Sequence, residues 1–371
     1  MRITAVEPVV LGLPLEEPVT TSFGAMTHRY AILVRIETDS GSVGWGESWS
    51  NFPVWSPRER VYTIAEGLAP LLTGEDPRQV AWLHEKMMAR MSRLALQWGA
   101  PGPIHQAISS VDIALWDLLG KEVGQPVCQL LGGRPRAVPV YASGLGPKDP
   151  VRLAAPLLDQ GVAVVKLKVG FGQEVDLMNL TAVRECLGPE RLLLMDANQA
   201  WDLHTARQML DLMAPFEPYW LEEPLPANQV SELADLRRST SIRIVAGENA
   251  YGRAGFRALL EAGAVDLVQP DVCKTGGLTE ARAICQMAES YGVPYAPHYL
   301  GSAIGLVASL HLCASTPGFW RMELDANPNP FRSEMVGHAL TVKDGCLSVP
   351  DGPGLGVEPE SALIEQYRIK Y

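Results

Sequence analysis

Three acidic residues recur at a constant spacing in the middle of the chain. Asp196, Glu222 and Glu248 stand 26 residues apart, and each follows a short apolar run. One strand and one helix of a (β/α) barrel together take about 25 residues, so the spacing predicts three successive strands with carboxylates at the same end. Clustered carboxylate oxygens favour a hard dication. We therefore expect these three side chains to bind Mg²⁺.

Two lysines precede the first of these carboxylates by about one barrel unit. Lys166 and Lys168 are two residues apart on a predicted strand, so both side chains point to the same, inner side. Neighbouring ammonium groups lower each other's pKa, and a lysine in such a pair serves as a base near neutral pH. Taken alone, the pair is also compatible with a solvated strand end.

A histidine and two more carboxylates follow at similar spacings of 23, 27 and 25 residues. Asp271 and His298 each come after a short apolar strand, and Glu323 ends the last one. A carboxylate on one strand can orient an imidazole on the next and raise its basicity. A glutamic acid kept protonated by enclosure can donate a hydrogen bond to an oxyanion. The alternative for His298 is a structural histidine, and the alternative for Glu323 is a partner in a surface salt bridge.

The elements that must position these residues follow from hydrophobic periodicity. The first 125 residues predict an α+β unit, with strands over 3–13 and 30–38, a hairpin near Gly41, and three helices. The helices are expected over 57–72, 76–91 and 104–121. Eight strands alternating with helices then predict a barrel, over 138–145, 164–170, 191–198, 219–224, 242–249, 266–272, 294–299 and 321–324.

These elements predict an α/β protein with a (β/α)8-type TIM barrel and a smaller cap. We expect a capping domain over 1–125, a catalytic barrel over 126–325, and a segment over 326–371 that packs back on the cap. Chemistry in such a barrel belongs at the carboxyl ends of the strands.

Composition excludes several classes of protein. Of 371 residues, 47% are hydrophobic and 20% charged, as in a soluble globular domain, and no apolar run is long enough to span a membrane. A net charge of −11 argues against nucleic acid as a partner. The six cysteines form no C-x-x-C pair, and the N-terminus lacks the apolar region of a signal peptide. We expect a cytoplasmic enzyme with reduced thiols.

The ordered set of motifs resembles the enolase superfamily, within it the mandelate racemase/muconate lactonizing enzyme family, and there the mandelate racemase branch. Asp271, His298 and Glu323 belong to the set. The other matching motifs are Asp39-Ser40-Gly41, Gly44-Trp45-Gly46-Glu47, Val111-Asp112-Ile113-Ala114-Leu115-Trp116-Asp117, Leu130-Leu131-Gly132-Gly133, Lys166-x-Lys168, Asp196-Ala197-Asn198-Gln199, Glu222-Glu223-Pro224, Gly247-Glu248 and Gly276-Gly277.

The resemblance implies an enolase-type (β/α)7β barrel and a homo-oligomer of two to eight subunits. It implies Mg²⁺ on the three carboxylates, with Lys168 and the His298–Asp271 pair as acid–base groups. Lys166 and Glu323 would contact the substrate carboxylate or enediolate. The implied reaction removes the α-proton of a small-molecule carboxylate and ends in dehydration, cycloisomerisation or racemisation.

Family members choose substrates with cap loops, here expected over 20–27 and 48–55. Among the residues there, Phe23 and Trp55 are candidate substrate contacts, together with Asn198 and Tyr141 of the barrel; the aromatics could equally fill the domain interface. The segments Asn329-Pro330-Phe331-Arg332 and 350–356 resemble acid-sugar dehydratases and galactarolactone cycloisomerase, which favours a hydroxylated acid or its lactone.

Three alternatives remain from the sequence. Lys274 resembles the second lysine of the muconate-lactonizing and dipeptide-epimerase branches, although strand alternation from Asp271 predicts that it points away from the barrel axis. A non-catalytic ligand-binding barrel would not need the full polar set. A phosphate-handling barrel would need a Gly-rich phosphate loop of the nucleotide type, which the chain lacks.

Overall fold

The computed structural model describes residues 1–371 and begins with an antiparallel sheet. Its strands are β1 (Ile3–Thr21), β2 (Gly24–Thr38) and β3 (Val43–Ser48). The tail of the chain returns to this sheet, because β12 (Arg368–Ile369) pairs with the outer edge of β1.

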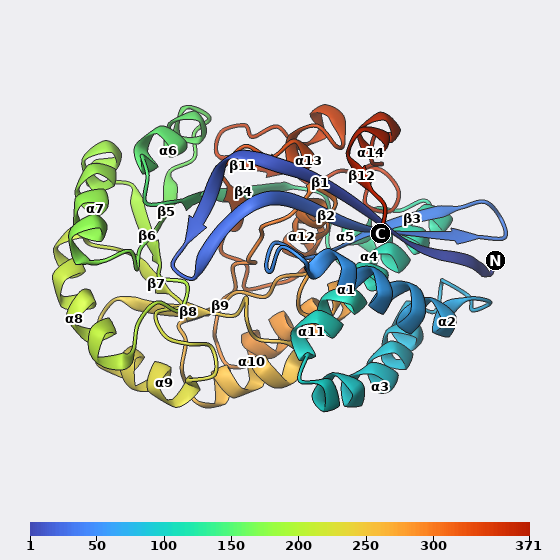
Figure 1. The fold of residues 1–371 in the computed structure, drawn as a ribbon, viewed down its shortest axis with the longest axis horizontal. Helices are drawn as coiled ribbons and strands as arrows, with labels where there is room; N and C mark the ends of the chain where they lie inside the picture. Colours follow the sequence, from blue (N-terminus) through green and yellow to red (C-terminus); the bar gives the residue numbers. More distant parts are fainter.

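The β1–β2 hairpin is longer than the sequence predicted, which corrects the loop expected over 20–27. Pairing continues to Thr21 opposite Gly24, so this stretch is the tip of a hairpin whose backbone groups are satisfied across the ladder. Figure 1 shows the hairpin in blue reaching from the cap across to the barrel. There Ser22 Oγ donates a hydrogen bond of 2.8 Å to the carbonyl of Asn198.

Helices cover one face of the sheet and complete the cap. The longest, α4, is bounded by Pro101 in its first turn, where a missing N–H costs nothing, and by Gly124 in the left-handed conformation just beyond its end. Apolar residues of the helices and the sheet form one buried core. The cap helices are α1 (Ser56–Tyr62), a π-helical turn (Thr63–Leu68), α2 (Ala69–Leu72), α3 (Val80–Trp98) and α4 (Pro101–Val123).

The second unit is a ring of parallel strands, which confirms the predicted fold class. The ladder order is β10-β4-β5-β6-β7-β8-β9. Its two edges are linked by single bridges from Val268 to Tyr295 and from Tyr295 to Phe319, so the strand predicted over 294–299 is reduced to one bridging residue. The strands are β4 (Ala137–Leu145), β5 (Val164–Lys168), β6 (Leu192–Asp196), β7 (Trp220–Glu222), β8 (Arg243–Ala246), β9 (Leu267–Val268) and β10 (Met322–Asp325).

Helices alternate with these strands and surround them (Figure 1). They are α6 (Pro150–Asp159), α7 (Gln173–Leu187), α8 (Leu203–Met213), α9 (Val230–Arg238), α10 (Gly252–Glu261), α11 (Gly277–Ser290) and α12 (Ala303–Ser315). Short elements complete the chain: α5 (Val127–Leu130) before the barrel, then α13 (Pro330–Ser333), β11 (Cys346–Ser348) and α14 (Ser361–Tyr367) after it. No helix is both long and apolar enough to cross a membrane.

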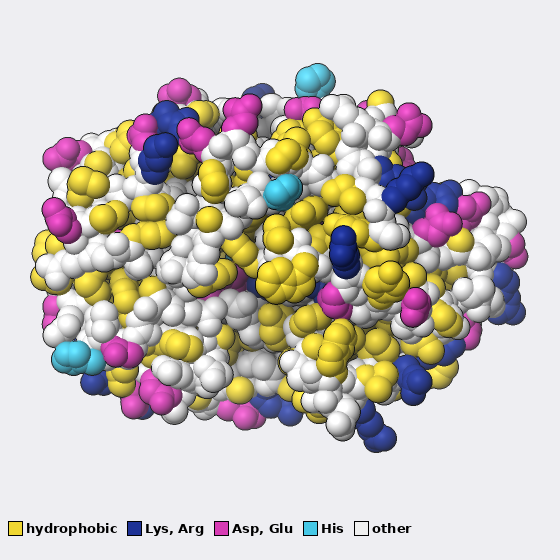
Figure 2. Space-filling view, in the orientation of Figure 1, with side chains coloured by type: hydrophobic (Ala, Val, Ile, Leu, Met, Phe, Trp, Pro, Cys, Tyr) yellow, Lys and Arg dark blue, Asp and Glu magenta, His cyan; other side chains and the backbone are white.

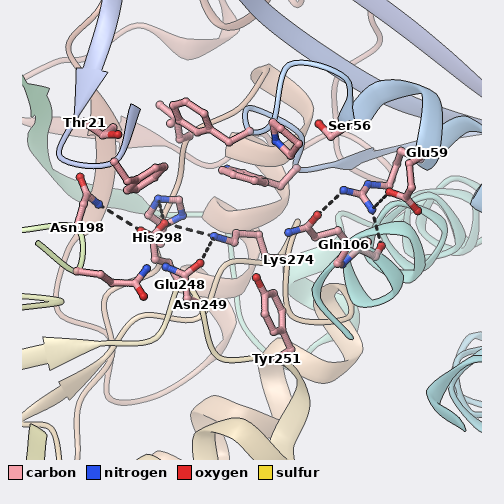
Figure 3. A pocket seen from close by; sticks show the side chains of 18 of the residues that line it. Thr21, Ser56, Glu59, Gln106, Asn198, Glu248, Asn249, Tyr251, Lys274 and His298 are labelled. Atoms are coloured by element: carbon pink, nitrogen blue, oxygen red, sulfur yellow. Dashed lines mark hydrogen bonds and ion pairs between the residues drawn. The ribbon is translucent and has the colours of Figure 1, made fainter. Parts of the chain in front are cut away.

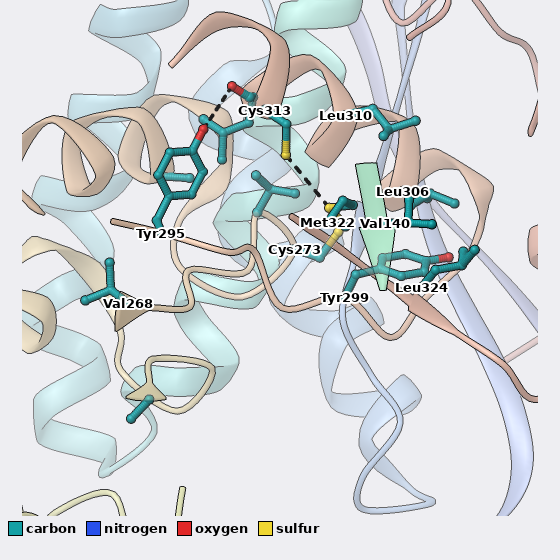
Figure 4. Close-up of a cluster of buried hydrophobic side chains, with 14 of the residues drawn as sticks. Val140, Val268, Cys273, Tyr295, Tyr299, Leu306, Leu310, Cys313, Met322 and Leu324 are labelled. Atoms are coloured by element: carbon teal, nitrogen blue, oxygen red, sulfur yellow. Dashed lines mark hydrogen bonds between the residues drawn. The ribbon is translucent and has the colours of Figure 1, made fainter. Parts of the chain in front are cut away.

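Two apolar layers fix the barrel strands. Between α12 and the strands, Val140, Leu306 and Met322 belong to the main core (Figure 4). Inside the ring, the rings of Tyr141 and Trp220 meet edge to face with centroids 5.6 Å apart. Tyr141 is fully buried and does not line the pocket, and its role as a substrate contact stays a prediction.

Candidate active site

Strand register brings the first charged residues to one level. Lys168 pairs with Asp196 on the next strand, and Asp196 pairs with Glu222 on the one after. Glu248 follows β8 by two residues, at the same end of the barrel. Consecutive parallel strands therefore deliver this set to one mouth, the place where barrel chemistry occurs.

Lys166 lies at the centre of the buried charges and has no exposed surface. Its Nζ is 2.7 Å from Glu222 Oε2, 2.7 Å from Glu323 Oε1 and 3.6 Å from Asp196 Oδ2. Burial alone would lower the pKa of Lys166, but the charges of Glu222 and Glu323 outweigh it and raise that pKa well above its ordinary value. Lys166 is a fixed cation.

Lys168 stands nearer the surface of the same mouth and donates a hydrogen bond to Asp196 Oδ2. Burial lowers its pKa, yet the Asp196 carboxylate overrides both burial and the charge of Lys166, so the pKa of Lys168 is raised. The sequence predicted mutual lowering by the two lysines. The charge of Lys166 does act in the predicted direction on Lys168, but in this arrangement the Asp196 carboxylate acts more strongly in the opposite direction.

His298 is held on both sides by carboxylates. Its Nδ1 is 2.7 Å from Asp271 Oδ2, and its Nε2 is 2.7 Å from Glu248 Oε2. Burial lowers the pKa of the imidazole, but Glu248 and Glu323 raise it more, to about 10. The imidazole is thus oriented by Asp271 and lies between two carboxylates.

Glu323 accepts three hydrogen bonds at the end of β10. The donors are Lys166 Nζ, the backbone N–H of Tyr299 at 3.0 Å, and the hydroxyl of Ser143. Burial raises the pKa of Glu323, but Lys166 and His298 together lower it below its ordinary value. In this arrangement two cations face the carboxyl group and favour its ionised form, and donation of a hydrogen bond by Glu323 to an oxyanion stays a prediction.

Lys274 lies in the site, contrary to the prediction from strand alternation. Its Nζ is 3.4 Å from Glu248 Oε2, 3.4 Å from Asn249 Oδ1 and 4.3 Å from the ring centroid of Trp49. The alternation rule fails because the strand ends at Val268 and a turn follows, so side chains no longer point alternately in and out.

A buried carboxylate of the cap secures the loop that carries the imidazole. Glu47, on β3, accepts three hydrogen bonds of 2.7 Å, from the N–H and hydroxyl of Ser302 and from the N–H of Gly305 in the first turn of α12. Burial raises the pKa of Glu47 to about 7. Asn51 adds a bond of 2.7 Å to the carbonyl of Leu300. The cap thus fixes part of the barrel mouth.

A pocket of about 480 Å³ opens above these residues, between the cap and the barrel. Figure 2 shows this face hollowed, with hydrophobic side chains gathered on the rim. Phe23 and Trp55 line the pocket and are 59% and 70% exposed, so they stand at its entrance. Lys168, Asn198, Glu248, Lys274 and His298 line it too, whereas Lys166, Glu323 and Tyr141 lie below.

Family models match both units of the chain. The description "Mandelate racemase / muconate lactonizing enzyme, N-terminal domain" fits residues 4–132, and "Enolase C-terminal domain-like" fits residues 149–363. The chain belongs to the mandelate racemase/muconate lactonizing enzyme family. It is therefore an enzyme of the enolase superfamily, of the lyase or isomerase type, as the sequence predicted.

Known proteins of the family match this chain over all or nearly all of its length. D-galactarolactone cycloisomerase from Agrobacterium fabrum is 36% identical, covering 100% of this chain and 99% of the relative. Arabinonate dehydratase from Saccharolobus solfataricus is 33% identical over 91% of each chain. Among solved structures, a racemase from Streptomyces coelicolor with bound magnesium is 30% identical, covers 99% of this chain and 100% of its own, and has a TM-score of 0.90.

The residues present fit a magnesium ion. Asp196, Glu222 and Glu248 offer only hard oxygen ligands, and burial together with the charge of Asp196 raises the pKa of Glu222 to about 8. In the structure, lysine and histidine cations neutralise the three carboxylates, and no three acidic, histidine or cysteine side chains surround a common point. A dication bound at these strand ends would add positive charge to three carboxylates that otherwise repel one another.

Sequence reasoning missed the residues that line the other side of the pocket. Glu59 and Arg60 come from α1, and Gln106 comes from α4, both expected only as cap helices. No sequence pattern pointed to them. Asn249 and Tyr251 were also missed, although the position of Asn249 directly after Glu248 at a strand end was a usable indication.

Proposed function

We propose that this enzyme removes the proton next to the carboxylate of an acid sugar, or of its lactone, in a Mg²⁺-dependent reaction. The observation that carries the proposal is the placement of Lys168 and His298. Both line one pocket, and they come from opposite sides of the strands that bear the three carboxylates. The acid-sugar substrates of the curated relatives support the substrate class.

The α-proton of a carboxylate is very weakly acidic, because its removal places two negative charges on one carboxyl group. Asp196, Glu222 and Glu248 would hold Mg²⁺, which supplies positive charge for the oxygen where that negative charge develops. Lys166 fixes Glu222 and Glu323 from below. The site is thus ordered before substrate enters, so little reorganisation is needed during the reaction.

Two groups would transfer protons on different sides of a bound substrate. Lys168 would take or return the α-proton once Asp196 no longer needs the Lys168 ammonium as its counter-charge. His298, oriented by Asp271, would donate a proton to a departing hydroxyl or ring oxygen, or to the opposite face of the carbon. Elimination, cycloisomerisation and racemisation share this first step.

The test combines metal removal with hydrogen exchange. Enzyme stripped with EDTA should catalyse neither turnover nor exchange of the α-proton for deuterium, and added Mg²⁺ should restore both. The substrates are a panel of aldonates, aldarates and aldarolactones. Full activity in excess chelator, with no metal left in the protein, would contradict the proposal.

A second candidate function uses Lys274 in place of His298, as in the two-lysine branch. The position of Lys274 in the pocket favours it. In that case Lys274→Ala should abolish net conversion and His298→Asn should stay active. Under the main proposal His298→Asn stops net conversion while Lys168 still exchanges the α-proton. Assembly as a homo-oligomer stays a prediction from the sequence.

A further inference from the structure

The pocket has a second end, built by the cap and remote from the acid–base residues. Figure 3 shows Asn198 and His298 at one end, Lys274 in the middle, and Gln106 and Glu59 at the other. A substrate whose carboxylate lies at the reaction end therefore extends its tail toward α1 and α4. The groups at this cap end decide which tails are accepted.

The one cation of the cap end is already neutralised. Arg60 donates hydrogen bonds to Glu59 Oε2 at 2.6 Å, to the carbonyl of Pro103 at 2.7 Å and to Gln106 Oε1 at 2.5 Å. Its side chain is 2% exposed, so its remaining unpaired Nε–H is out of reach of a ligand. The Glu59 side chain is 25% exposed. A ligand tail therefore approaches the anion of this pair and not its cation.

The other polar groups of the cap end are uncharged. The amide nitrogen of Gln106 is turned toward Lys274, and the phenol of Tyr251 points into the same space (Figure 3). Trp49 and Phe52 supply apolar walls. An amide, a phenol and aromatic faces suit the hydroxyl and C–H groups of a sugar chain, since each of these contacts needs no charge.

We infer that the cap end selects substrates with an uncharged, hydroxylated tail, so that the enzyme takes aldonates or aldarolactones in preference to open-chain aldarates. Glu59 is the specificity-determining residue, because its carboxylate would lie near the second carboxylate of an aldarate and repel it. This inference rests on the proposed function and adds to it that the tail of the preferred substrate is uncharged.

The experiment compares an aldonate, an aldarolactone and an aldarate of the same carbon skeleton, across the hexose configurations, with Mg²⁺ present. In the wild-type enzyme we expect kcat/KM for the open aldarate to be lower by about tenfold or more. In Glu59→Gln the cation of Arg60 loses its counter-charge, so the disadvantage of the aldarate should shrink by about tenfold. The readout is the ratio of kcat/KM for the aldarate to kcat/KM for the aldonate or lactone.

Glu66→Gln is the matched control, because Glu66 is exposed on the neighbouring helical turn and does not line the pocket. Melting curves establish that both variants are folded. A wild-type enzyme that takes the aldarate as well as its neutral-tailed partners would overturn the inference, as would a Glu59→Gln variant with an unchanged ratio. Absence of α-proton exchange with every acid sugar would instead refute the proposed function itself.

Discussion

The two ends of the pocket hold charge in different ways. At the reaction end, four cations and five carboxylates are interlocked, and almost all are buried. At the cap end there is one ion pair, surrounded by an amide, a phenol and aromatic rings. The reaction end must meet a developing charge, which requires dipoles and charges fixed in advance. The cap end only has to recognise a tail, for which uncharged contacts suffice.

The two ends of the pocket also come largely from different units, the reaction end from the barrel and the cap end from the capping domain. The charges of the reaction end sit on barrel strands and on the loops directly after them, where the ladder fixes their spacing. The cap end is built chiefly from α1, α4 and the loop between β3 and α1, whose side chains take no part in the strand ladder. Substrate preference can therefore change while the proton-transfer chemistry stays the same.

Replacing the base at the reaction end should have the largest effect. Lys168→Ala should lower kcat by about 10²–10⁴-fold, because it removes a general base. Lys168→Arg keeps the positive charge beside Asp196 but cannot release its proton, so it should be equally slow. Single-turnover kinetics measure both variants. An arginine variant within tenfold of wild type would assign Lys168 an electrostatic role only.

Two buried histidines sharpen the contrast between charged and uncharged surroundings. Unlike His298, His311 meets only backbone groups, the N–H of Cys128 and the carbonyl of Leu355. Burial lowers the pKa of His311 from 6.5 to about 4. The unfolded chain therefore binds this proton first, and stability present above pH 6.5 is lost as the pH falls toward 4.

The expected loss is about 3 kcal/mol between pH 7 and pH 4, from a shift of roughly 2.5 pKa units. Urea unfolding of the wild type and of His311→Asn across this pH range measures it. The asparagine oxygen can replace Nδ1 as acceptor for the Cys128 N–H, and the variant should show a flatter pH dependence. An equal slope in both proteins would show that this histidine is protonated without penalty.

Lys274 lies between the two ends of the pocket, and its replacement tests whether it belongs to the reaction end or to the cap end. Lys274→Ala should reduce kcat/KM by about ten- to a hundredfold, the worth of a buried hydrogen bond to a charged group, chiefly through KM. Lys148→Ala, at a side chain that is 85% exposed, is the control. Complete loss of α-proton exchange would instead make Lys274 part of the proton-transfer machinery.

The smallest effect is expected at the entrance of the pocket. Trp55→Ala should raise KM by roughly two- to tenfold, because a largely exposed ring contributes about 0.5–1.5 kcal/mol of contact. Trp82→Ala is the matched control, since Trp82 is 54% exposed on α3 and does not line the pocket. A drop in kcat without a change in KM would show that Trp55 acts at the reaction end after all.

The sequence by itself determined the barrel and the charged residues at the ends of its regular strands. The 26-residue spacing of Asp196, Glu222 and Glu248 reflects the fixed length of a strand–helix unit. The alternation of Lys166 and Lys168 reflects the two-residue period of a strand. Both are local rules of geometry, so they hold wherever the regular element continues, and the structure brings these side chains together.

Only the tertiary structure decided what lies outside regular elements or joins distant ones. Lys274 faces the pocket because a turn interrupts the strand period, and Tyr141 is sealed beneath the site by Trp220. The contact of Glu47 with α12 joins residues more than 250 positions apart. The pKa directions of the buried charges depend on which partner lies nearest, and that distance exists only in the folded chain.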